Sequence, residues 1–128
     1  MAGQNMLPGS WGNISIKINK NAYAITPSGR GYDNLTPDDI TIVDAAGQTL
    51  DGALIPSSEL PLHLAIYKAL PEANAVVHTP SIYASACAAA RRAIPPLIED
   101  MVQIMGRAVH CAEYAPQGTE TIAQNGIK

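Results

Sequence analysis

The chain has 128 residues, of which 47% are hydrophobic and none is phenylalanine, so it can form one small globular domain with an aliphatic core. The formal net charge is -3, and acids and bases are mixed along the sequence, which excludes a basic surface for nucleic acid or membrane lipid. The sequence has neither a basic, apolar leader nor an apolar run long enough to cross a bilayer, so a cytoplasmic protein is expected.

The first half of the chain predicts antiparallel strands. Apolar and polar residues alternate strictly from Ile14 to Ile18, which is typical of a half-buried strand. Thr36 and Pro37 suit the N-cap and the first position of a short helical turn, which is expected before the third strand. The expected strands are 14–18, 23–26, 40–43 and 49–50, with a loop that contains two glycines at 27–31.

The second half alternates helices with strands. Ser58 is expected to cap a helix whose apolar face ends near Leu70, and the apolar run Ala75–Val77 is typical of a central strand. The further expected elements are helices at 79–90, 97–105 and 119–125 and a last strand at 108–114. This order predicts an α/β fold in which helices cover a mixed sheet.

Glu59, His63 and His78 are candidates for acid–base or metal chemistry. Glu59 and His63 lie four residues apart on the predicted helix and therefore share a face, but spacing alone favours a dipole-stabilised glutamate beside a packed histidine. His78 ends a predicted strand and can be a metal ligand. A zinc site needs three or four ligands, so spacing alone again favours a hydrogen-bonded structural histidine.

Three loops offer polar groups that can bind an anion without lysine or arginine. They supply hydroxyls, one side-chain amide and backbone N–H groups at Gly12–Asn13, Ser28–Gly29 and Ser57–Ser58. Each is ordinary turn chemistry by itself. They form a phosphate site only if the loops converge in space.

The other polar and sulfur-containing residues have structural interpretations. Cys87 and Cys111 are expected to be reduced, buried thiols, with one disulfide as the alternative. Tyr114 is interpreted as a packed loop residue, with a proton donor as the alternative. The remaining acids, which are Asp38, Asp39, Glu99 and Asp100, are interpreted as solvated helix ends, and the pair Arg91–Arg92 is interpreted as a favourable charge at a helix C-terminus.

Six motifs occur in a fixed order along the chain. They are Gly12-Asn13-Ile14-Ser15, Ile25-Thr26-Pro27-Ser28-Gly29, Leu35-Thr36-Pro37-Asp38-Asp39, Ser57-Ser58-Glu59, Ala75-Val76-Val77-His78-Thr79 and Tyr114-Ala115-Pro116-Gln117-Gly118-Thr119. Together they resemble the class II aldolase/adducin family, and the arrangement is closest to its L-fuculose-1-phosphate aldolase branch. The resemblance covers nearly the whole chain from Gly12 onward.

The resemblance implies a three-layer α/β/α sandwich around a largely antiparallel mixed sheet. It implies one domain over residues 1–128 that lacks the family's N-terminal helix and C-terminal segment. The expected partners are a small phosphorylated sugar and further copies of the chain, which form a tetramer in the family with active sites between subunits. The expected cofactor is zinc, which three histidines hold and which stabilises the enediolate of dihydroxyacetone phosphate.

The resemblance also assigns roles to individual residues. Glu59 matches the catalytic base, and His78 matches the first zinc ligand. The residues that match the phosphate site are Asn13, Ser28, Gly29, Ser57 and Ser58.

Two departures from the family pattern concern the metal. Pro80 occupies the position of the second histidine in the family's His-x-His motif, and a proline side chain has no donor atom. The third family histidine lies in a C-terminal segment beyond Lys128, and neither His63 nor His110 aligns with a ligand position. A single histidine binds zinc weakly, so metal binding and catalysis are both expected to be impaired.

Several functions are therefore compatible with the sequence. The favoured hypothesis is a sugar-phosphate aldolase with impaired catalysis, which cleaves an L-fuculose-1-phosphate-type substrate into dihydroxyacetone phosphate and an aldehyde. The alternatives are a non-catalytic adducin-like binding or assembly domain and an epimerase or dehydratase of the same family. A naturally short chain and a fragment of a longer aldolase both stay open.

Overall fold

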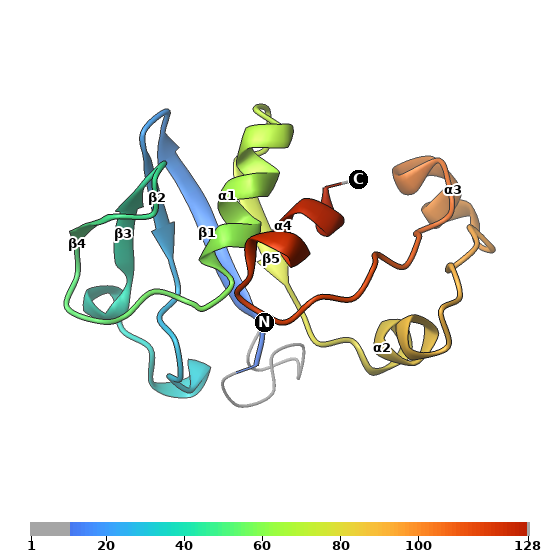
Figure 1. The fold of residues 1–128 in the computed structure, drawn as a ribbon, viewed down its shortest axis with the longest axis horizontal. Coiled ribbons are helices and arrows are strands. Elements are labelled where there is room, and N and C mark those ends of the chain that lie inside the picture. Colours follow the sequence, from blue (N-terminus) through green and yellow to red (C-terminus); the bar gives the residue numbers. More distant parts are fainter. Residues whose placement is uncertain (1–10, 128) are drawn as a thin grey trace.

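The computed structural model describes residues 11–127 and shows a five-stranded sheet with the order β4-β3-β2-β1-β5 (Figure 1). The strands are β1 (Asn13–Asn19), β2 (Ala22–Ile25), β3 (Thr41–Asp44), β4 (Thr49–Asp51) and β5 (Ala75–His78). The helices are α1 (Leu60–Ala69), α2 (Ile82–Ala89), α3 (Glu99–Met105) and α4 (Glu120–Gly126), with short 3-10 turns η2 (Tyr32–Asn34) and η3 (Pro37–Asp39). The predicted α/β class is confirmed. The neighbouring strands pair antiparallel throughout this sheet.

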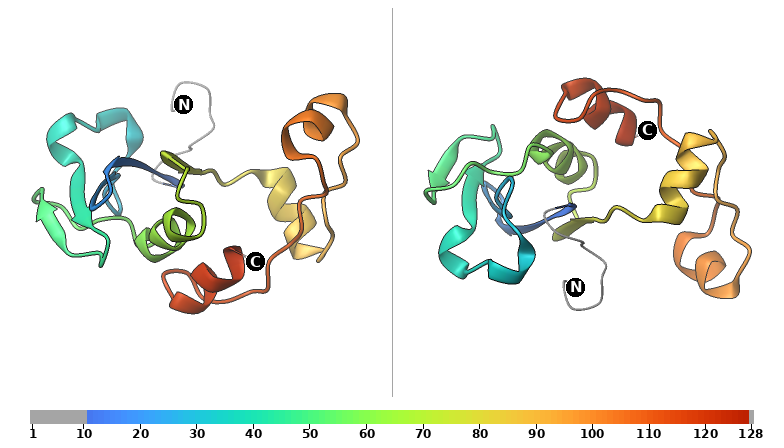
Figure 2. Two further views of the ribbon diagram at one scale, coloured as in Figure 1. Left: turned by 90° about the horizontal axis from the view of Figure 1, so that it is seen from above. Right: turned by 90° about the horizontal axis from the view of Figure 1, so that it is seen from below.

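The alternation in β1 sorts its side chains onto the two faces of the sheet. Ser15 pairs with Ile25, which in turn pairs with Thr41, and this buried row lies on the face that α1 covers (Figure 2). Ile16 points to the opposite face and is 55% exposed. Residues 11–127 thus provide the sheet and one helical layer of the expected sandwich.

The core lies between the sheet and α1. It consists of Tyr23, Ile25 and Val43 from the sheet and Leu60 and Tyr67 from the helix. The rings of Tyr23 and Tyr67 stack with their centroids 4.8 Å apart, so tyrosine supplies the aromatic volume in a sequence without phenylalanine.

Asp39 stabilises the chain reversal that precedes β3. One of its carboxylate oxygens accepts hydrogen bonds from the Thr36 N–H and hydroxyl, both at 2.9 Å, and the other accepts one from Arg30 at 2.9 Å. The hydrogen bonds from Thr36 are the main reason that the pKa of Asp39 lies below its usual range. The prediction of a solvated Asp39 is wrong, because its side chain closes a capping box and the residue is 9% exposed.

The strand β5 lies at an edge of the described sheet and pairs with β1. The prediction of a central strand is wrong here, since Val77 is 47% exposed. An apolar run does not by itself distinguish a central strand from an edge strand, because the difference depends on which strands pair with it.

The helices α2 and α3 lie beside the sheet rather than on it (Figures 1 and 2). The Ser81 hydroxyl caps α2 by accepting a hydrogen bond from Ala84 N at 3.3 Å, so this helix begins later than the predicted Thr79. An apolar cavity of about 670 Å³ lies between α2 and the pair α1 and α4. This part of the chain is therefore supported mainly by its own contacts.

The predicted strand at 108–114 is wrong. This segment makes a single bridge between Ile94 and Val109, with both N–H···O distances at 2.9 Å. Arg91, interpreted from the sequence as a helix-end charge, links α2 to this segment: it donates to Ala112 O at 2.8 Å and forms an ion pair with Glu113. The Arg91 side chain and one bridge thus take the place of the backbone hydrogen bonds that a paired strand would make.

The helix α4 packs against α1 and returns the chain to the centre of the fold (Figure 1). The Thr119 hydroxyl accepts a hydrogen bond from Ile122 N at 3.3 Å, which confirms the predicted cap. Gly118 has a positive φ of 76°, and a Cβ atom there would lie 3.0 Å from Ser58 O, so only glycine allows this close approach. Within residues 11–127, none of the helices is long and apolar enough to span a bilayer.

Candidate functional site

A cleft of about 510 Å³ opens where β1 begins, β5 ends and α1 starts. The residues to which the family motifs assign phosphate, proton and metal chemistry all line it: Asn13, Ser28, Gly29, Ser57, Ser58, Glu59 and His78. The three loops therefore converge in space, as a phosphate site requires.

Backbone hydrogen bonds hold two of the loops together. Ser28 N donates to Ile55 O at 2.9 Å, and Ser57 N donates to Thr26 O at 3.1 Å, across a bridge between Pro27 and Pro56. The N–H groups of Ser28 and Ser57 are thus used within the protein. Their hydroxyls are the groups that these residues can offer to a ligand.

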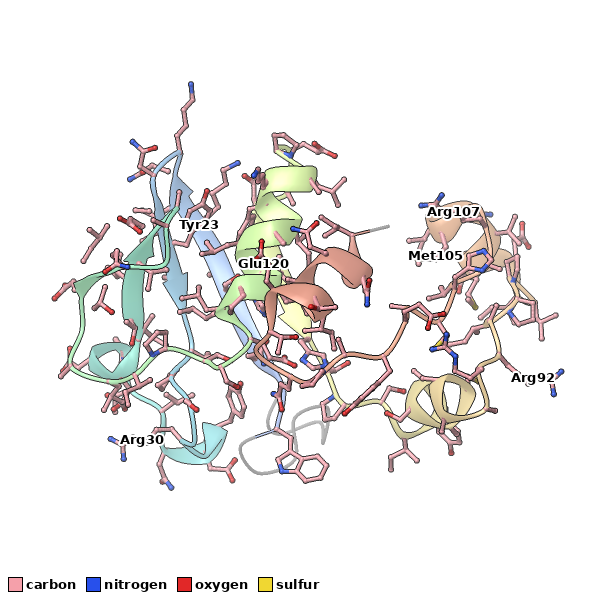
Figure 3. All side chains as sticks on the ribbon, in the orientation of Figure 1. Tyr23, Arg30, Arg92, Met105, Arg107 and Glu120 are labelled. Atoms are coloured by element: carbon pink, nitrogen blue, oxygen red, sulfur yellow. The ribbon has the colours of Figure 1, made fainter. Side chains whose placement is uncertain are left out.

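Among the residues that the structure describes, the lining of the cleft carries no lysine or arginine. Arg30, Arg92 and Arg107 extend outward at the periphery of the molecule (Figure 3). Hydroxyl and amide donors at the start of a helix are well suited to an anion, because the helix dipole places partial positive charge there.

Glu59 connects the loops to β5. Its backbone N–H donates to the Ser57 hydroxyl at 3.2 Å, and its Oε2 accepts a hydrogen bond from Asn13 Nδ2 at 2.7 Å and also pairs with His78 Nδ1. The hydrogen bond from His78 holds the pKa of Glu59 below its usual range, although burial opposes this shift. The same bond raises the pKa of His78. The pair therefore favours a carboxylate beside an imidazolium.

A buried chain of hydrogen bonds continues from Asn13 into the core. Asn13 Oδ1 lies 2.5 Å from His63 Nε2, and the other ring nitrogen of His63 lies 2.6 Å from the Ser15 hydroxyl. That hydroxyl in turn lies 2.8 Å from the hydroxyl of Tyr67. Burial is the main reason that the pKa of His63 falls from 6.5 to about 4, and burial also raises the pKa of Tyr67.

The sequence found the residues in the cleft but not this buried chain. His63 was favoured as a packed histidine, and the structure places it at 0% exposure. It shares a helix face with Glu59, yet the two side chains meet through Asn13. The buried chain could have been found from the polar residues at alternate positions in β1, which are Asn13 and Ser15. Alternation places both of them on the covered face of the sheet.

Tyr114 departs from its prediction as a packed residue. It lines the cleft and is 84% exposed, so its ring is available to a ligand or to another chain. Gln117, which follows it, donates to the Ser58 hydroxyl at 3.4 Å. Cys87 and Cys111 are free thiols, as expected, but both are only partly buried.

The donors in the cleft do not fit a metal site with three histidines. Zinc in a catalytic site takes three protein ligands, and residues 11–127 contain no group of three His, Cys, Asp or Glu side chains that could hold a metal ion. Both ring nitrogens of His63 are hydrogen-bonded inside the core, and His110 lines a different cavity. His78 and Glu59 are the two such donors that line the cleft.

Comparison with known proteins relates this cleft to a family. The sequence pattern described as "Class II Aldolase and Adducin N-terminal domain" matches residues 1–128. The chain belongs to the class II aldolase and adducin family. An L-fuculose phosphate aldolase of Escherichia coli (strain K12) is 35% identical over 91% of this chain and 54% of its own length. The resemblance inferred from the motifs is thus confirmed.

Other members of the class II aldolase and adducin family have different activities. An L-ribulose-5-phosphate 4-epimerase of Salmonella paratyphi C (strain RKS4594) is 42% identical over 69% of this chain and 39% of its own length. The solved structure of an L-fuculose 1-phosphate aldolase superimposes with a TM-score of 0.88 at 33% identity, covering 97% of this chain and 58% of that one. The chain therefore spans somewhat more than half the length of the aldolases that it matches.

The burial of His63 predicts how stability depends on pH. The unfolded chain takes up a proton on His63 near pH 6.5, whereas the folded chain resists it down to about pH 4. The free energy of unfolding is therefore expected to fall by up to ~3 kcal/mol as pH drops through this window. Urea denaturation at a series of pH values measures it.

The variant His63→Gln is expected to flatten this part of the stability curve, because it removes the titrating ring. The matched control is His110→Gln, which replaces an exposed histidine and should leave the slope unchanged. A His63→Gln curve that runs parallel to the wild-type curve would show that another group causes the acid loss of stability.

Proposed function

We propose that the cleft binds a small phosphorylated sugar and that Glu59 transfers the proton in an aldolase-type cleavage of that sugar. The phosphate is held by the donors at Asn13, Ser28, Gly29, Ser57 and Ser58. The observation that carries the proposal is the convergence of these separate loops around one buried carboxylate, in a cleft whose described lining has no lysine or arginine.

The proposed phosphate site uses neutral donors. The loop at 57–59 leads directly into α1, so a phosphate there lies near the positive end of the helix dipole. The backbone pairing between the loops at Pro27 and Pro56 keeps their hydroxyls in place before the ligand arrives. Prior ordering of donors lowers the entropy cost of binding.

Glu59 is suited to accept a proton. In a retro-aldol cleavage Glu59 would take the proton of the hydroxyl beside the breaking C–C bond, and the O–H electron pair would form the carbonyl of the released aldehyde. The electrons of the broken C–C bond would pass to the other product, which then takes up a proton to give dihydroxyacetone phosphate. Glu59 is ionised at neutral pH, because the hydrogen bond from His78 lowers its pKa. Among the described residues, His78 is the one imidazole that lines the cleft. Because a single imidazole is left to meet negative charge on the other product, turnover is expected to be impaired.

Two alternatives use the same cleft. The 42% identity to the epimerase favours a reaction in which a sugar phosphate is epimerised rather than cleaved into two products. A non-catalytic adducin-like domain would bind the phosphate or assemble with other chains without turnover. The aldolase and epimerase proposals share the phosphate site and differ in their product, whereas the adducin-like proposal gives no product.

Removal of one hydroxyl tests the phosphate site. Ser57→Ala is expected to weaken binding of L-fuculose 1-phosphate about tenfold, because a donor to a charged group is lost. Isothermal titration calorimetry measures the dissociation constant, and Ser85→Ala, on the exposed face of α2, is the matched control. Equal affinity in Ser57→Ala and the wild type would remove Ser57 from the site.

The same ligand tests the role of Glu59. Glu59→Gln is expected to bind L-fuculose 1-phosphate within a few-fold of wild type but to release dihydroxyacetone phosphate at least ~100-fold more slowly. Binding without product in the wild type would favour the adducin-like alternative. An isomerised sugar phosphate without cleavage would favour the epimerase alternative.

The ligand set predicts weak zinc binding. The chain purified without a histidine tag is expected to carry no stoichiometric zinc, because the cleft provides too few ligands. Elemental analysis measures the metal content. Stoichiometric zinc that is lost on the change His78→Ala would contradict this expectation and favour an active metalloenzyme.

We also propose that the chain forms a homo-oligomer, for which the family resemblance implies a tetramer. Large apolar side chains stand exposed on α2 and near it, including Ile82, Tyr83 and Leu97 at 82%, 86% and 81%. Exposed apolar surface of this kind is typical of an interface between chains. Sedimentation velocity tests the proposal, and a monomer over the full concentration range would overturn it.

A further inference from the structure

We propose that His63 is a positioning residue that fixes the orientation of the Asn13 amide, so that the NH2 group and not the oxygen faces Glu59 and the bound phosphate. The inference rests on the proposed function, because it explains how the phosphate site keeps one of its donors. His63 does not line the cleft and is 0% exposed. It therefore acts through Asn13 and not by touching the ligand.

The direction of the hydrogen bonds follows from Glu59. An ionised carboxylate can only accept hydrogen bonds, so the Asn13 atom 2.7 Å from Glu59 Oε2 must be the amide nitrogen. The amide oxygen then points the other way, toward His63 Nε2 at 2.5 Å. An oxygen without a hydrogen needs a donor there, so Nε2 carries the proton of the ring.

The other side of the ring agrees with this assignment. The low pKa of His63 keeps the buried ring neutral at neutral pH, so with its proton on Nε2 the Nδ1 atom is an acceptor. The Ser15 hydroxyl, 2.6 Å from Nδ1, donates to it, and the same oxygen accepts from the Tyr67 hydroxyl at 2.8 Å. Every donor from Tyr67 to Asn13 thus points along the chain toward Glu59.

Reversal of the amide would break the site at both ends. The Asn13 oxygen would face the Glu59 carboxylate, which is also an acceptor, and the NH2 group would face a ring nitrogen that already carries a hydrogen. The amide nitrogen has two hydrogens, and Glu59 uses one of them, which leaves the second for an anion in the cleft that Asn13 lines. By donating to the amide oxygen, His63 holds Asn13 in the orientation that offers this hydrogen to an anion.

Two substitutions separate positioning from simple packing. His63→Leu removes the donor to Asn13, whereas in His63→Gln the amide NH2 can take the place of Nε2–H. With inorganic phosphate as the probe, His63→Leu is expected to raise the dissociation constant about tenfold, and His63→Gln is expected to stay within about threefold of wild type. A loss of packing alone would affect both variants or neither.

Nuclear magnetic resonance of the wild-type chain gives a readout that does not depend on ligand binding or on the folding of a variant. The nitrogen shifts of the His63 ring are expected to show the Nε2–H form. A ring protonated at Nδ1, or a folded His63→Leu variant that binds phosphate as tightly as wild type, would overturn the inference. An Nε2–H ring in a chain that binds no phosphate would support the amide orientation and overturn the proposed function instead.

Discussion

A buried carboxylate can only accept hydrogen bonds, and at Glu59 this property orders the groups around it. The side chain is largely buried at the start of α1, where an unpaired charge would strongly destabilise the fold. Asn13 from β1 and His78 from β5 both direct a donor at the same oxygen. The placement of two strands and one helix is thus tied to the protonation state of one group.

This arrangement joins stability to chemistry. The hydrogen bonds that make the charge of Glu59 tolerable also hold it next to the loops that carry Ser28 and Ser57. Among the residues that the structure describes, no buried side-chain nitrogen or oxygen lacks a partner. A polar network of this kind specifies one geometry when it is fully satisfied, and it becomes costly when any member is removed.

The sequence predicted those features that follow from local pattern. Alternation in β1 and the cap at Thr119 gave the correct elements, because each depends on neighbours along the chain. The family motifs identified the residues that line the cleft. The edge position of β5 and the orientation of Asn13 were beyond reach, since they depend on which strands pair and which rings lie across the core. The segment 108–114 was predicted as a strand, although it makes only one bridge.

The segment that contains α2 and α3 is held together by contacts within itself. These are the bridge from Ile94 to Val109 and the contacts of Arg91 with Ala112 and Glu113. Neither α2 nor α3 is among the elements that pack closely on the sheet or on α1, and a cavity lies between α2 and α1. Opening of this unit therefore exposes little of the core formed by Tyr23, Ile25 and Val43. In hydrogen-exchange terms, we expect residues 11–127 to form two cooperative units, in which the amides of α2 and α3 open at a lower free energy than those of β1 and β2.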